Sequence, residues 1–245
     1  MLKEAIQYLY TIGADNAQTE IIEVDGVKYT TKDMNAVFAP TFKARPLTAC
    51  TLTALIDYLH GKQEELKESM IIHVKSPTEV SLFSGLDGHR EREELFQTKA
   101  TLKGFYFNEW YDQENFIINA QTNFETTEDM KAILAVAGNI KNETVANYGD
   151  DGTSQKATIS KGIASEANVL IPNPVLIKPY RTFLEVKQPE SRCVFRISED
   201  GSGKPKFKLI EADGGMWRME AVANICEYIN NNIPSNLKGR ITVIG

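Results

Sequence analysis

The sequence has few of the residues that hold metal ions or form disulfides. Its 245 residues include three cysteines and three histidines. Cys50, Cys193 and Cys226 lie far apart and show no CxxC or CxxH spacing, and no HExxH motif is present. These spacings argue against a disulfide framework and against a zinc site. We therefore expect no structural metal, no cofactor and a reducing, cytoplasmic compartment.

Long apolar runs are also missing. No stretch of about 18 apolar residues occurs, so we expect no segment that spans a membrane. Residues 2–10 place Leu2, Ile6 and Leu9 on one stripe, and Glu4 interrupts the apolar character. This pattern predicts an amphipathic helix instead of a signal peptide.

Sequence motifs for nucleotide chemistry and nucleophilic catalysis are absent as well. The chain has neither a GxxxxGKS/T phosphate loop nor a GxGxxG turn, and its histidines are scattered. No Ser/His/Asp or Cys/His arrangement suggests itself. We therefore assign no catalytic residue and favour a function without catalysis.

The stretch YGDDGTSQK at residues 148–156 allows three interpretations. Adjacent carboxylates such as Asp150 and Asp151 point apart in an extended chain, so the run most simply forms a turn that leads into a strand. An anion contact through Thr153, Ser154 and Lys156 stays open. A third interpretation, in which the two aspartates hold a catalytic metal, lacks further carboxylates or histidines nearby in a suitable pattern.

Positive charge is scarce overall and unevenly distributed. The formal net charge is −6, which argues against a general duplex-binding protein. Residues 152–208 nevertheless hold ten Lys or Arg against five Asp or Glu, so this segment carries +5 and the remainder −11. Either these cations lie on solvated strand faces, or they form an anion-binding surface.

The order of the segments predicts an α+β fold with mainly antiparallel sheets and four to five helices. Asp25-Gly26 between two β-rich runs is a hairpin signal, and Thr126 or Thr127 can cap a helix. We expect an N-terminal α+β region over residues 1–110, then a helical segment and a β-rich region over residues 111–245. The two regions could also form one domain. The helix that contains Trp217 should pack on the C-terminal sheet.

Two further segments are candidate ligand sites. KPYRTF combines Lys178, Tyr180 and Arg181, a set in which the arginine could hold a phosphate and the tyrosine could stack on a base. The alternative is a connection shaped by proline, with Tyr180 covering a sheet edge. GGMWRME places two glycines before a helix N-terminus, where Arg218 could help to bind an anion; the segment could equally belong to the core.

Several phrases resemble a phage and prophage family, the YfdQ-like proteins. They are VDGVKY, TLTALIDYL, HVKSPTEVSLFS, NEWYDQENFIINAQTNF, GDDGTSQKATISKGIA, IPNPVLIKPYRTF, QPESRCVFRI and GGMWRMEA. The resemblance implies a phage-encoded protein that works in the cytoplasm of the host cell. It implies no reaction, and no catalytic residue is transferred.

These observations leave three functional hypotheses. The first is a non-enzymatic phage accessory protein that binds a small anionic ligand or nucleotide and counteracts host defence signalling. The second is a protein that binds single-stranded DNA or assists phage replication and recombination. The third is a metal-dependent nucleotide hydrolase. A homo-oligomer is compatible with each of them.

Overall fold

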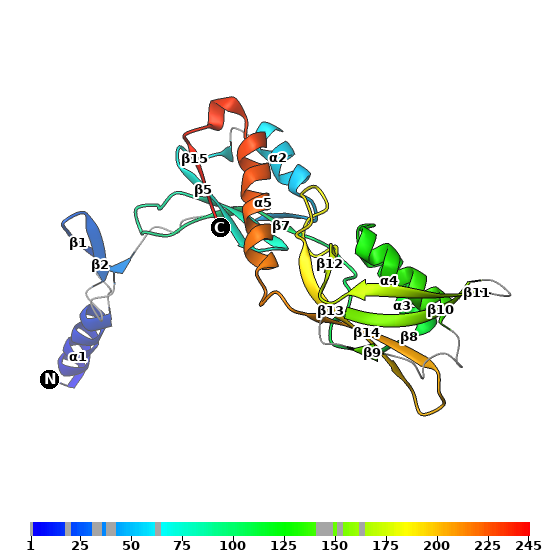
Figure 1. Ribbon diagram of the computed structural model, residues 1–245. Coiled ribbons are helices and arrows are strands. Elements are labelled where there is room, and N and C mark those ends of the chain that lie inside the picture. Colours follow the sequence, from blue (N-terminus) through cyan, green and yellow to red (C-terminus); the bar gives the residue numbers. More distant parts are fainter. Residues whose placement is uncertain are drawn as a thin grey trace. The chain divides into compact units, whose positions relative to one another are not determined.

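A computed structural model describes residues 2–17, 21–30, 36–37, 43–61, 65–140, 149–150, 154–161 and 165–245 (Figure 1). Only the backbone is described for residues 14–17, 36–37, 149–150, 154–161 and 165–170. Within these ranges the chain forms five α-helices and four sheets, of which three are antiparallel and one is mixed. The predicted α+β class is therefore confirmed. Among the described helices, none combines the length and apolar character needed to cross a membrane.

The chain divides into two units, Met1–Lys43 and Ala44–Gly245. The division into regions 1–110 and 111–245 expected from the sequence stays a prediction. The first unit contains the predicted hairpin, because Val24 pairs with Val27 around Asp25-Gly26. Both turn residues have positive φ, 52° and 78°, as a two-residue type I′ turn requires. The unit comprises α1 (Leu2–Ala17), β1 (Ile21–Val24), β2 (Val27–Thr30) and β3 (Ala36–Val37).

The second unit holds two hydrophobic cores. In the first core, two helices pack on one face of a five-stranded sheet with strand order β15-β5-β6-β7-β4 (Figure 1). The outer strands β15 and β4 run parallel to their neighbours, whereas the three central strands are antiparallel. The elements are β4 (Leu47–Ala49), α2 (Leu52–Gly61), β5 (Met70–Ser76), β6 (Glu79–Ser84), β7 (Glu94–Lys99), α5 (Trp217–Asn232) and β15 (Ile241–Ile244).

Helix α5 contributes Ala221, Ile225 and Ile229 as its buried residues. Ile225 and Ile229 join the first core, so the helix packs against β5 and β15. The sequence predicts that this helix packs on a sheet of C-terminal strands. The structure differs in the sheet, since β15 is its one C-terminal strand and the other strands lie within residues 47–99.

The second core lies between two helices and one face of an antiparallel sheet with strand order β12-β13-β14-β8. Stacked and edge-to-face rings of Phe105, Phe116, Phe195 and Phe207 fill its centre. A separate sheet, β11-β10-β9, adjoins helix α4. The elements are β8 (Tyr111–Asp112), α3 (Gln113–Asn123), α4 (Glu128–Asn139), β9 (Gly149–Asp150), β10 (Ser154–Lys161), β11 (Ser165–Pro172), β12 (Val175–Ile177), β13 (Ser191–Glu199) and β14 (Pro205–Glu211).

Side-chain caps explain where these helices begin. Asp112 accepts a hydrogen bond from the backbone N–H of Asn115 and caps α3. Thr127, one of the two residues proposed from the sequence, accepts from the N–H of Met130 and caps α4. Each cap satisfies a backbone donor that has no partner within its helix.

The loop of residues 178–190 connects the two cores. It leaves β12 in the second core and places Phe183 and Val186 among the buried residues of the first. Thr182 Oγ1 donates to the carbonyl oxygen of Pro77 at 2.6 Å. Glu185 Oε1 accepts from the N–H groups of Leu52, at 2.8 Å, and of Thr53, at 3.3 Å. A carboxylate from a distant part of the chain therefore caps α2.

We expect Glu185→Ala to lower the free energy of unfolding by about 1–2 kcal/mol, because the first N–H groups of α2 lose their acceptor. Glu185→Gln keeps a carbonyl acceptor and should cost less. The urea midpoint at an unchanged m-value measures both effects. Glu227→Ala, an exposed residue on α5, is the matched control. Equal midpoints for Glu185→Ala and Glu227→Ala would contradict this role.

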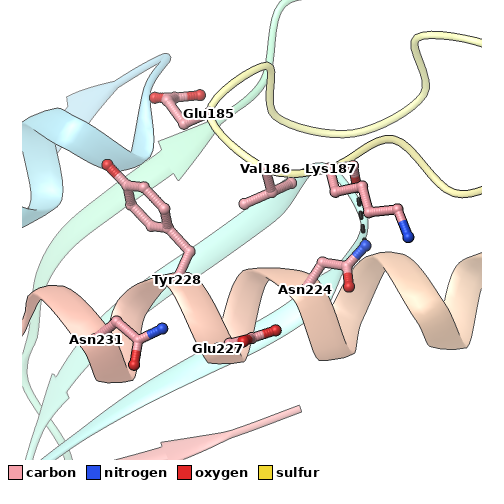
Figure 2. Close-up of a pocket in the computed structure, with 7 residues that line it drawn as sticks. All are labelled: Glu185, Val186, Lys187, Asn224, Glu227, Tyr228 and Asn231. Atoms are coloured by element: carbon pink, nitrogen blue, oxygen red, sulfur yellow. Dashed lines mark hydrogen bonds between the residues drawn. The ribbon is translucent and has the colours of Figure 1, made fainter.

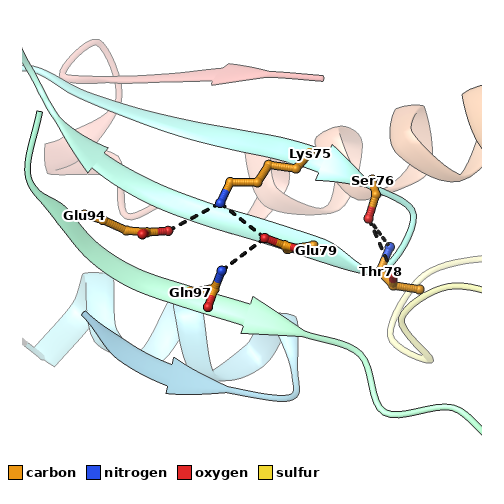
Figure 3. Close-up of polar contacts among 6 residues, drawn as sticks. All are labelled: Lys75, Ser76, Thr78, Glu79, Glu94 and Gln97. Carbon is orange, nitrogen blue, oxygen red and sulfur yellow. Dashed lines mark hydrogen bonds and ion pairs between the residues drawn. The ribbon is translucent and has the colours of Figure 1, made fainter. Parts of the chain in front are cut away.

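A polar cluster stabilises the solvent side of the five-stranded sheet (Figure 3). Lys75 Nζ lies 3.2 Å from Glu79 Oε1 and 3.5 Å from Glu94 Oε1, and Gln97 Nε2 donates to Glu79 Oε1 at 3.0 Å. The hydrogen bond from Lys75 is the main cause that lowers the pKa of Glu79 below its ordinary value of 4.5.

This lowered pKa has a defined effect on stability. A carboxyl whose pKa falls on folding stabilises the protein above its unfolded pKa, and this contribution is lost as the pH falls from about 4.5 through the folded value. We expect Lys75→Met to return the pKa of Glu79 toward 4.5, as measured by NMR titration of the carboxyl carbon. Lys131→Met, which breaks the separate pair with Glu128, should leave Glu79 unchanged. An unaltered Glu79 titration in Lys75→Met would refute the assignment.

Candidate functional site

Arg181, a candidate ligand-binding residue, contacts groups of the protein itself. Its guanidinium forms an ion pair with Glu211 and donates a hydrogen bond to Ser191 Oγ. The same group lies 4.1 Å from the ring centre of Trp217 and 5.0 Å from that of Phe107. The side chain is only 11% exposed, and burial lowers its pKa while Glu211 opposes that shift. Arg181 therefore joins the loop of residues 178–190 to β14 and to α5.

This arrangement gives Arg181 a structural role, and the phosphate-binding role expected from the sequence stays a prediction. A guanidinium that is already paired and covered by two aromatic rings would have to exchange these partners before it could hold a ligand. Its neighbours Lys178 and Tyr180 are half-buried, and their backbone groups pair with Glu125 and Asn123. These contacts are compatible with a connection shaped by proline, and ligand binding by Lys178, Tyr180 and Arg181 stays a prediction.

The remaining candidates lie in other places. Arg218 is exposed in the first turn of α5, with its guanidinium 4.6 Å from the ring centre of Trp217. Ser154 and Lys156 belong to β10, of which only the backbone is described, and Thr153 lies outside the described residues. A shared pocket for Lys156 and Lys178 thus stays a prediction.

The structure describes part of the aspartate-rich stretch. Asp150 is in the short strand β9, where it pairs with Gln155 of β10, while Asp151 lies outside the described residues. Within the described part of the chain, no group of three or more His, Cys, Asp or Glu residues is placed to hold a metal ion. Burial raises the pKa of the Cys193 thiol to about 12, so this cysteine is protonated at neutral pH and not nucleophilic.

We expect Arg181→Ala to destabilise the protein by about 3 kcal/mol, because the change leaves Glu211 unpaired beside the emptied space at Trp217. Arg218→Ala removes a cation from the same ring at an exposed position and should cost about 1 kcal/mol or less. Urea denaturation followed by tryptophan fluorescence measures both. A variant Arg181→Ala with wild-type stability would contradict the structural role and restore the ligand-binding one.

A second group of cations gathers on the sheet of the second core. Along β13 and β14, one set of alternate side chains is buried, apart from the strand ends, and the other set is exposed or half-buried. Six residues of this second set define what we call the outer face. They are Arg192, Val194 and Arg196 on β13, and Lys206, Lys208 and Ile210 on β14.

The strand register groups these charges. Arg196 pairs directly with Lys208, Val194 with Ile210, and Arg192 with Leu176 of the edge strand β12. Lys206 stands two positions from Lys208 on the same strand, so the Cα atoms of the two lysines are about 7 Å apart. One end of the outer face is therefore cationic, and an aliphatic strip separates it from Arg192.

An exposed aromatic ring adjoins the cationic end. Trp110 precedes β8, which pairs with β14, and the ammonium of Lys208 lies 4.5 Å from its ring centre. The residue is 45% exposed. Asp112 stands opposite Lys206, but its carboxylate accepts from the backbone and side-chain amides of Asn115, which lower its pKa. Among the described residues, Arg192, Lys206 and Lys208 form no ion pair.

The sequence contains a signal for this face. RCVFR and KFKLI alternate cations or small aliphatic residues with buried apolar ones, and the segment of residues 152–208 carries the charge excess. The strand register cannot be predicted from the sequence. This register pairs Arg196 with Lys208 and brings Trp110 beside them.

A pocket of about 210 Å³ lies between α5 and the loop of residues 178–190 (Figure 2). Asn224 Nδ2 donates to the carbonyl oxygen of Lys187 at 2.9 Å across it. The lining carries two carboxylates, from Glu185 and Glu227, and one ammonium, from Lys187. This balance of charge does not favour a small anion.

Comparisons with protein-family models, with curated proteins and with solved structures found no match. The resemblance to the YfdQ-like proteins stays a prediction.

Proposed function

We propose that the protein binds single-stranded nucleic acid through the outer face of β13 and β14. The observation that carries this proposal is the grouping of Arg196, Lys206 and Lys208 beside the exposed ring of Trp110. Cations that follow a phosphate backbone, together with an aromatic ring on which a base stacks, are the usual elements of single-strand binding.

The extent of the outer face favours a polymer over a mononucleotide. Six residue steps lead along β13 from Arg192 to Ser198, the partner of Lys206, which corresponds to about 20 Å at 3.4 Å per residue. Cations occur at both ends of this length, and the outer-face side chains of β13 and β14 are exposed or half-buried. A small anionic ligand, the first choice from the sequence, would contact only one end.

The apolar part of the face favours a single strand over a duplex. Val194 and Ile210 lie between the two cationic ends, and Leu176, which pairs with Arg192 on the neighbouring strand, is 43% exposed. Unpaired bases can cover such aliphatic groups and stack on Trp110, whereas a duplex hides the faces of its bases. The remainder of the chain, with a charge of −11, repels polyanions elsewhere.

The proposal is for an accessory protein without catalysis, in a reducing cytoplasm. Cys50, Cys193 and Cys226 are free thiols, which is common in such a compartment. If the YfdQ-like resemblance holds, the nucleic acid would be bound during phage replication or recombination in the host cell.

We expect the double variant Lys206→Ala/Lys208→Ala to weaken binding of a labelled oligothymidine and to reduce the slope of log K against log salt by about 1.4, because two cations no longer displace counterions. Trp110→Ala should weaken binding by about 5- to 150-fold, and Trp110→Phe should retain most of it. Fluorescence anisotropy at several salt concentrations measures these values.

The matched control is Lys67→Ala/Lys238→Ala, which removes the same charge from exposed lysines outside β13 and β14. It should leave the salt slope unchanged. Equal losses of affinity in the two double variants would show that net charge, and not the outer face, governs binding. Wild-type protein that binds no single strand would refute the proposed function.

A further inference from the structure

We infer that the outer face binds single strands without reading their base sequence, and that it accepts DNA and RNA alike. This inference rests on the proposed function and concerns the chemistry of the same face. Contacts to the phosphate backbone position a nucleic acid, whereas hydrogen bonds to base edges specify its sequence. The side chains available on the face therefore decide between general and selective binding.

Apart from the two arginines, the side chains of the outer face and the adjoining Trp110 belong to two kinds. Lysines such as Lys206 and Lys208 act as point charges toward phosphate. Trp110, Val194 and Ile210 offer apolar or aromatic surface, and every base has a face that can stack on it. Neither kind distinguishes one base from another by hydrogen bonding.

The polar groups that could read a base edge are few in the described part of the face. Asp112 directs both carboxylate oxygens to Asn115, at 2.9 Å and 2.7 Å, and so caps α3. Ser198 pairs with Lys206 at the far end of the strands. Asn108 is exposed beside β14, where its backbone N–H donates to the carbonyl oxygen of Leu209 at 2.8 Å.

Two arginines need separate consideration. A guanidinium can bind the edge of guanine with two hydrogen bonds, so Arg192 or Arg196 could favour guanine-rich strands. The register sets Arg196 directly opposite Lys208, so a phosphate that contacts Lys208 would also lie near the guanidinium. We therefore assign Arg196 to the backbone of the strand rather than to a base.

The sugar is the remaining group by which the protein could distinguish RNA from DNA. RNA differs from DNA by its 2′-hydroxyl, which a protein recognises through a hydrogen-bonding partner. The phosphate and the stacking faces of the bases are common to both polymers, and these are the groups that lysines and Trp110 contact. The same affinity is therefore expected for DNA and RNA of matched sequence.

The test compares wild-type protein with oligomers of equal length, namely dT, dA, dC, rU and a mixed strand containing guanine, at one salt concentration. We expect dissociation constants that agree within about tenfold, with a duplex of the mixed strand bound more weakly than any single strand. A preference above about tenfold for one base, or for one sugar, would overturn the inference and leave the proposed function intact. Failure of every single strand to bind would instead contradict the proposed function.

Two variants identify the residue that causes any base preference that is found. Asn108→Ala removes the exposed amide, and Arg192→Lys keeps the charge but loses the planar fork that can grip guanine. Under sequence-independent binding, both variants should bind all oligomers with unchanged ratios. A ratio that changes by more than about tenfold in either variant would identify a base-reading residue and would refute the inference.

Discussion

The two-residue period of β13 and β14 determines what this protein can present to a ligand. Successive side chains of a strand point to opposite faces, so burying Cys193, Phe195, Phe207 and Leu209 forces Arg192, Arg196, Lys206 and Lys208 outward. A register slip of one residue would bury the cations and expose the phenylalanines. The charged face is thus tied to the same packing that stabilises the second core, and neither can change without the other.

The loop of residues 178–190 couples this core to the first one. Phe183 and Val186 add apolar contacts, Glu185 caps α2, and Arg181 lies beside Trp217, at the start of α5. A buried ion pair such as that of Arg181 with Glu211 is weak evidence for stability by itself, since desolvation opposes the Coulomb attraction. Its two aromatic neighbours and its hydrogen bond to Ser191 hold the guanidinium in one position. The ion pair therefore specifies the position of the loop of residues 178–190.

Local patterns in the sequence predict local structure well here. The α+β class, the hairpin at Asp25-Gly26 and the cap at Thr127 all follow from residues within a few positions of each other, because turn chemistry and capping are short-range effects. The tertiary partners of Arg181 could not be predicted in this way. Ser191, Glu211 and Trp217 lie 10 to 36 positions away in the sequence, and only the folded chain brings them together.

The candidate site shows the same difference between features that neighbouring residues predict and contacts between residues far apart in the sequence. A charge excess over residues 152–208 is compatible with an anion-binding surface or with solvated strand faces, and a sum of charges does not say which cations share a face. The loop at residues 178–181 is conspicuous because it combines lysine, tyrosine and arginine, yet its arginine is used internally. The alternating cations of β13 and β14 resemble ordinary solvated strand faces until Trp110 is placed beside Lys208. The proposal of a binding face instead of a solvated one depends on this ring, which the chain leaves 45% exposed next to cations that the register sets together.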